Sequence, residues 1–116
     1  MWRKVGLGIV AILCLVSSCI AVSDSEVLQF ANGVLAGSYY GGPTTSSISG
    51  NMLTLTGQLS EYSDMKVDTV GYKLWDLSSC AQKVIDQYPG RIKQVELKIF
   101  AANGQGPIGY ASIAVN

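Results

Sequence analysis

The stretch that decides the fold runs from Ser63 to Tyr88 and reads SDMKVDTVGYKLWDLSSCAQKVIDQY. Its apolar residues recur every three or four positions and fall within an arc of about 100° when drawn on a helix, which is typical of a helix packed on a core. Ser63 or Asp64 can accept hydrogen bonds from the first turn, and Pro89 disfavours the helical conformation at Tyr88. We therefore predict one long amphipathic helix with apolar positions at 67, 70, 74, 77, 81, 84, 85 and 88.

Alternating runs flank this helix on both sides. Residues 51–59, NMLTLTGQL, place Leu53, Leu55 and Leu59 on one face, as expected for a half-buried strand. Residues 91–101 and 108–115 also alternate, and the turn NGQGP between them favours a hairpin. For residues 51–116 the sequence predicts a two-layer α+β domain, in which one long helix packs on a small, mostly antiparallel sheet in the order strand, helix, hairpin.

Residues 19–50 are predicted to form an N-terminal spacer. Residues 24–36, DSEVLQFANGVLA, have apolar side chains at helical spacing, with Asp24 as a candidate cap. The Asn-Gly pair at 32–33 interrupts them, so we expect a short helix or an irregular packed segment. Residues 37–50, GSYYGGPTTSSISG, are rich in Gly, Ser and Thr, which predicts a loop or linker.

Residues 1–18 have the organisation of a signal peptide. Arg3 and Lys4 are followed by an apolar run and then by the small residues Ser17 and Ser18. The four residues Val16-Ser17-Ser18-Cys19 resemble a bacterial lipobox, in which the cysteine becomes the lipidated N-terminus. The sequence thus predicts export, lipidation of Cys19 and attachment to a membrane of the cell envelope, on its periplasmic side or at the cell surface.

Two other outcomes stay open for this segment. A general signal peptidase could cut after Ser23, or the apolar run over 5–22 could stay uncut as an anchor, although a spanning helix needs about 20 apolar residues. The outcome bears on Cys80: lipid on Cys19 leaves Cys80 without an internal partner, whereas a free thiol at 19 could pair with it in an oxidising compartment.

Composition excludes several classes of function. The chain has 8 basic and 8 acidic residues, and loss of residues 1–18 would leave a net charge of about −2. Nucleic-acid binding needs clustered positive charge, so nucleic acid is not expected as a partner. The chain has no histidine, which excludes Ser-His and Cys-His nucleophile activation. The two cysteines left after loss of residues 1–18, without histidine, cannot form a standard structural zinc site. We expect no cofactor.

Two motifs have catalytic or metal-binding counterparts, and both have simpler explanations. Ser63 and Lys66 match the Ser-x-x-Lys pattern of penicillin-recognising enzymes, but the companion motifs are absent and the chain is too short for that catalytic domain. Glu61, Asp64 and Asp68 could hold a hard cation, although acids at a helix N-terminus are expected from the helix dipole. We predict no catalytic and no metal site.

Four aromatic residues are the candidate partner contacts. Tyr72 and Trp75 lie off the apolar stripe, and Tyr39 and Tyr40 lie in the Gly-rich segment. Exposed aromatic residues can mark a binding surface. Cys80 lies on the flank of the stripe and is interpreted as a passive small residue. We expect a small lipoprotein that acts as a non-catalytic binding or assembly module for an envelope protein. The alternative is a soluble secreted inhibitor or ligand-binding protein cut after Ser23.

Overall fold

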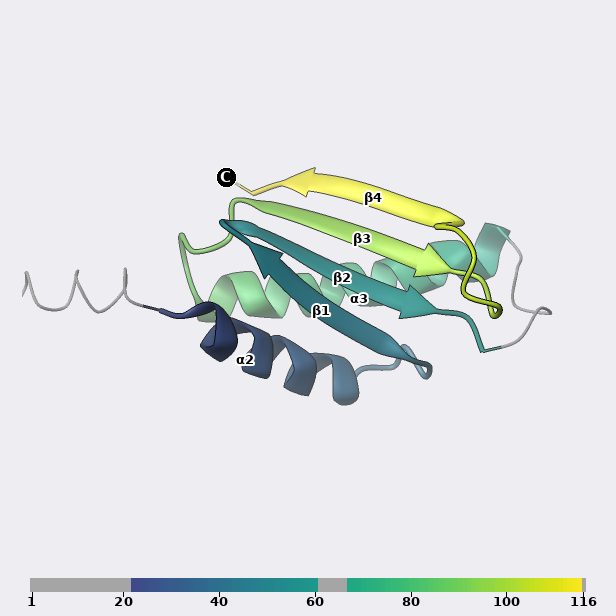
Figure 1. Cartoon of the computed structure of the whole chain (residues 1–116), viewed down its shortest axis with the longest axis horizontal. Coiled ribbons are helices and arrows are strands. Elements are labelled where there is room, and N and C mark those ends of the chain that lie inside the picture. Colours follow the sequence, from purple (N-terminus) through teal and green to yellow (C-terminus); the bar gives the residue numbers. More distant parts are fainter. Residues whose placement is uncertain (1–21, 61–66, 116) are drawn as a thin grey trace, which may run out of the picture.

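The computed structural model describes residues 22–60 and 67–115, which form an α+β fold with one four-stranded mixed sheet and two helices (Figure 1). The strands lie in the order β1-β2-β3-β4. The central pairing, β2 with β3, is parallel, and the two outer pairings are antiparallel. The elements are α2 (Asp24–Ala36), β1 (Thr44–Ser49), β2 (Met52–Gln58), α3 (Val67–Gln87), β3 (Gln94–Phe100) and β4 (Gly109–Ala114).

The predicted order of strand, helix and hairpin is confirmed in β2, α3, β3 and β4. The sheet has one strand more than predicted. Residues 24–36, expected as a short helix or an irregular segment of a spacer, form a helix that belongs to the helical layer. The β2–β3 pairing is parallel because α3 runs back along the sheet between them, so that both strands point the same way. Residues 63–66 of the predicted helix lie outside the described residues.

The loop predicted over residues 37–50 is wrong for residues 44–49, which form β1. This strand pairs with β2 through a two-residue turn, so that Ser49 lies opposite Met52. Gly50 in that turn has φ 60°, the left-handed conformation that a tight hairpin requires and that glycine adopts without strain. The Ser- and Thr-rich segment is therefore one of the two edge strands of the sheet.

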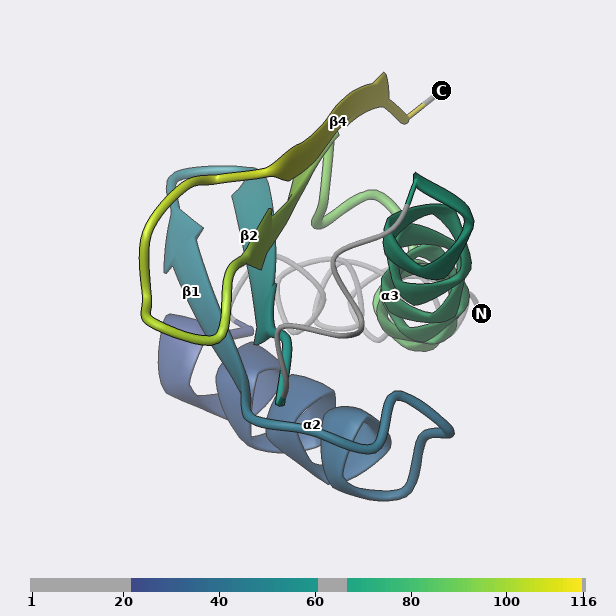
Figure 2. The ribbon, with the colours of Figure 1, turned by 90° about the vertical axis from the view of Figure 1, so that its right-hand side faces the viewer.

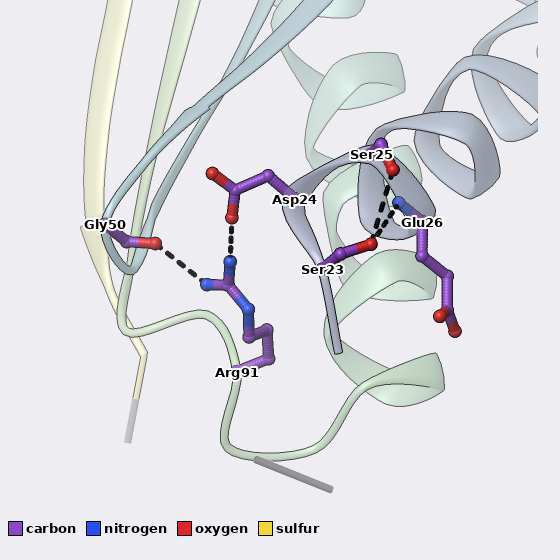
Figure 3. Close-up of polar contacts among 6 residues, drawn as sticks. All are labelled: Ser23, Asp24, Ser25, Glu26, Gly50 and Arg91. Carbon is purple, nitrogen blue, oxygen red and sulfur yellow. Dashed lines mark hydrogen bonds and ion pairs between the residues drawn. The ribbon is translucent and has the colours of Figure 1, made fainter. Parts of the chain in front are cut away.

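α2 is a continuous helix, and its cap differs from the predicted one. The hydroxyl of Ser23, rather than the carboxylate of Asp24, accepts a hydrogen bond from the backbone N–H of Glu26 at 3.2 Å (Figure 3). Gly33 does not interrupt the helix, and its carbonyl oxygen accepts a hydrogen bond from the N–H of Gly37. Tertiary packing outweighs the low helix propensity of the Asn32-Gly33 pair, because the inner face of α2 is buried in the core. That face consists of Val27, Ala31 and Leu35.

Both helices pack against one face of the sheet, giving two layers around a single core (Figure 2). Alternate residues of β2 and β3 point into this core, as the sequence alternation predicts. The other face of the sheet carries mainly polar side chains, and no described helix or strand covers it. The core of the sheet and of α3 includes Leu53, Leu55, Leu77, Val84, Val95, Leu97 and Ile99.

Arg91 joins three segments at one end of the sheet. Its Nη1 donates a hydrogen bond to the carbonyl oxygen of Gly50 at 2.8 Å, and its Nη2 forms an ion pair with Asp24 (Figure 3). The loop after α3, the β1–β2 turn and the first residue of α2 are thus held together. The Asp24 side chain is 58% exposed, so the ion pair itself contributes about 0–1 kcal/mol.

Candidate binding surface

Three of the four predicted contact residues lie on the surface and near one another. The exposed fractions are 97% for Tyr39, 73% for Tyr72 and 69% for Trp75. Tyr39 lies in the loop after α2, and the other two are three positions apart on α3, where such residues share a face. We call these three residues the aromatic patch.

A first hollow, of about 520 Å³, lies on the outer side of α3 between two members of the patch. Its described lining residues follow the helical spacing i, i+3, i+4 and i+7, so they lie on one face of the helix. Gly71 adds no side chain to the hollow, and a Cβ atom at this position would meet nothing within 4 Å among the described residues. The lining residues are Asp68, Gly71, Tyr72 and Trp75.

A second hollow, of about 280 Å³, lies between the loop after α2 and α3. Tyr39 lines one side and Trp75 the other, so that Trp75 belongs to both hollows. Asp76 and Lys83 bring opposite charges to this second hollow. The two hollows and the aromatic patch form one continuous surface with both apolar and charged groups.

Cys80 also borders the second hollow, but its side chain belongs to the core. It is only 3% exposed, so α3 turns this residue inward rather than leaving it on the flank. Burial raises the pKa of the Cys80 thiol, while a hydrogen bond with Ser38 and the charge of Lys83 oppose that change. A thiol with a raised pKa is a weak nucleophile. Cys19 lies outside the described residues, so its predicted lipidation and, in the alternative, its pairing with Cys80 both stay predictions.

Tyr40 was predicted as a surface contact, and this prediction is wrong. The residue is 1% exposed, and its ring packs on Gly57 of β2. The absence of a side chain at 57 creates the space for the ring. On the other side, Lys73 donates a hydrogen bond to the carbonyl oxygen of Tyr40, and its Nζ lies 4.5 Å from the ring centroid.

Within residues 22–60 and 67–115, no three His, Cys, Asp or Glu side chains come together in a way that could hold a metal ion. Asp68 is described, but its predicted acidic neighbours Glu61 and Asp64 are not, and neither are Ser63 and Lys66. In the same part of the chain, no helix has the length and apolar character needed to cross a membrane.

Comparisons with known proteins give no relative from which a role could be transferred. No protein-family model, no curated protein and no solved structure matches this chain. The case for a binding surface therefore depends on its own geometry. Sequence reasoning missed Asp68 and Gly71 as part of this surface, although their spacing to Tyr72 and Trp75 on the predicted helix was visible in the sequence.

Proposed function

We propose that this protein is an exported, membrane-tethered binding module of the cell envelope without catalytic activity. The observation that carries the proposal is the aromatic patch, in which Tyr39, Tyr72 and Trp75 are more than two-thirds exposed around two adjoining hollows. Large aromatic side chains are costly to leave in water, and they are the residues that most often anchor protein–protein contacts. The partner is an envelope protein that covers this patch.

The structure of the α2 N-terminus supports cleavage before Cys19 over cleavage after Ser23. A cut after Ser23 would remove the residue whose hydroxyl caps α2, and would place a positive α-amino group at the start of that helix. Loss of a cap costs about 1 kcal/mol, and a positive charge at a helix N-terminus is unfavourable. Val22 also packs on the core and would be lost with it.

The first test is the intact mass of the mature protein, purified from a detergent-solubilised membrane fraction. The proposal expects a chain that begins at Cys19 and carries added acyl mass, and it expects Cys19→Ser to abolish this processing. A lipid-free chain that begins at Asp24 would support the alternative, a soluble secreted inhibitor or ligand-binding protein. An uncut chain would show that residues 5–22 are the anchor.

The binding role is tested by photo-crosslinking in intact cells. A photoreactive amino acid at position 75 should give one dominant adduct with an envelope protein. The same group at Gln87, an exposed residue at the end of the same helix, is the matched control and should give none. Tyr72→Ala should weaken the position-75 adduct. Equal labelling from positions 75 and 87 would contradict a specific surface at the aromatic patch.

A further inference from the structure

Among the described residues no strand pairs with the outer edge of β4, and the backbone groups that point outward there can be assigned. Val115 donates a backbone hydrogen bond to the carbonyl oxygen of Lys93. In an antiparallel pair every second residue directs its backbone groups to the partner strand, so this bond shows which residues of β4 do so. Residues 109, 111 and 113 therefore direct their N–H and C=O groups toward β3, whereas those of Tyr110, Ser112 and Ala114 point outward. In Figure 1 no described element lies along that outer edge.

The side chains of β4 do not protect this edge in the usual ways. The strand GYASIA contains no charged residue and no proline, the features by which edge strands avoid pairing with other chains. Ile113 is 42% exposed although it belongs to the helix-covered face, opposite Val95. Tyr110 is 52% exposed on the open face. The edge thus combines unpaired backbone groups with apolar surface.

We propose that β4 pairs antiparallel with β4 of a second copy of this chain, about a two-fold axis at Ser112, to form one continuous eight-stranded sheet. In this register Ser112 faces Ser112 of the second copy, and Tyr110 faces Ala114. On the helix side, Ile113 faces Ala111. Every large side chain is therefore opposite a small one, and about six backbone hydrogen bonds form without a facing charge.

The helical layer has room for the second copy. α3 packs on β2, β3 and β4, so its axis lies over the region of β3. Between β3 of one copy and β3 of the other lie three strand spacings, about 14 Å in total. Packed helices need only about 8–10 Å between their axes. The two α3 helices fit side by side, and Ile113 of each copy fills the space between them.

The opposite edge of the sheet, formed by β1, differs from the β4 edge because a helix, α2, packs against it. The hydroxyl of Ser46 on β1 donates a hydrogen bond to the side-chain oxygen of Asn32 on α2 at 2.6 Å. The two edges therefore provide a matched comparison. Ser112 and Ser47 are both exposed serines near the middle of an edge strand, and both lie on the open face of the sheet.

The test is sedimentation equilibrium of the full chain in density-matched detergent micelles, with circular dichroism to show that each variant is folded. We expect the wild type to be a dimer. Ser112→Lys places two ammonium groups opposite each other and should raise the dimer dissociation constant at least about fivefold. Ser47→Lys should leave it unchanged. A monomeric wild type, an equal effect of both variants, or an effect of Ser47→Lys alone would overturn the proposal.

A disulfide test checks the register independently of folding stability. In the proposed pairing the Cα atoms at position 112 are about 5.5 Å apart, within the range that a disulfide spans. Ser112→Cys in the full chain should form a covalent dimer under mild oxidation, with the 112–112 link identified by peptide mass spectrometry. Ser47→Cys should form no 47–47 link. Absence of the 112–112 link would exclude this register.

Discussion

The ring of Tyr40 lies against the backbone of Gly57, in the space that a side chain at position 57 would occupy. A Cβ atom built on Gly57 would lie 2.3 Å from the ring carbon Cζ and from the hydroxyl oxygen of Tyr40. The two residues are 17 positions apart in the sequence, and their contact connects the loop after α2 to the central part of the sheet. The position of this loop, which also carries Tyr39 of the aromatic patch, therefore depends on a missing side chain in β2.

Gly57→Ala is expected to destabilise the protein. The added methyl group would displace the buried Tyr40 ring, and overpacking of this kind costs about 1–3 kcal/mol in the free energy of unfolding. Urea unfolding followed by circular dichroism measures the change. Gly33→Ala on the exposed side of α2, where a Cβ atom meets nothing within 4 Å, is the control and should stabilise the protein slightly. Equal stability of Gly57→Ala and wild type would contradict the packing described.

Tyr40→Phe is expected to stabilise the protein at neutral pH. The hydroxyl of Tyr40 is buried and finds no hydrogen-bond partner among the described residues. Removing a buried polar atom without a partner relieves its desolvation cost, so the free energy of unfolding should rise by about 1 kcal/mol. Tyr39→Phe, at a fully exposed tyrosine, should change nothing. A decrease in the stability of Tyr40→Phe would show that the hydroxyl has a partner.

The same variant should alter the stability of the protein in alkaline solution. Burial, together with the nearby charge of Asp76, raises the pKa of Tyr40 to about 12 from its ordinary value of 10.0. Above pH 10 the unfolded chain releases the Tyr40 proton while the folded chain retains it, so this residue favours unfolding as pH rises. Between pH 10 and 12 we expect the free energy of unfolding of the wild type to fall by about 2–3 kcal/mol through this residue. Tyr40→Phe should not show this part of the decrease. Parallel pH profiles of the two proteins would contradict this assignment.

Ser23→Ala should lower stability through α2. It removes the hydroxyl that accepts the hydrogen bond from the N–H of Glu26, and loss of such a cap costs about 1 kcal/mol. Ser25→Ala is the matched control, since among the described residues the side chain of Ser25 forms a hydrogen bond only with the hydroxyl of Ser23, at 3.3 Å. Thermal unfolding measures both variants. If Ser25→Ala had the larger effect, the cap would be assigned to the wrong residue.

Most of the fold was predictable because the buried faces of β2, α3 and β3 are continuous in the sequence. Their apolar residues repeat with the period of the element, and the same periods placed Tyr72 and Trp75 outside the core. β1 has no such pattern, because its helix-facing positions include Thr44 and Ser46 at the edge of the sheet. The signal that was missed is the Gly-Asn pair at 50–51, a two-residue hairpin connection between two β-prone runs.

The burial of Tyr40 could not be predicted from its neighbours in the sequence. The residue lies in a Gly-rich segment that reads as a loop, and its pocket is created by Gly57 on a strand that pairs with β1. The parallel pairing of β2 with β3 likewise depends on how α3 returns across the sheet. Both are consequences of tertiary structure. The aromatic patch could be predicted only in part. The helical period places Tyr72 and Trp75 outside the core, whereas the position of Tyr39 depends on where the loop after α2 lies.

The contact of Arg91 with Asp24 determines where α2 begins relative to the sheet. It fixes the first residue of α2 at the end of the sheet where the β1–β2 turn lies, and α2 then rises about 20 Å toward the opposite end. Force applied through residue 22 would load this surface ion pair together with the contact of Val22 with the core. Tyr39 follows the last residue of α2, so this exposed aromatic residue and the Arg91–Asp24 ion pair lie at opposite ends of the helix.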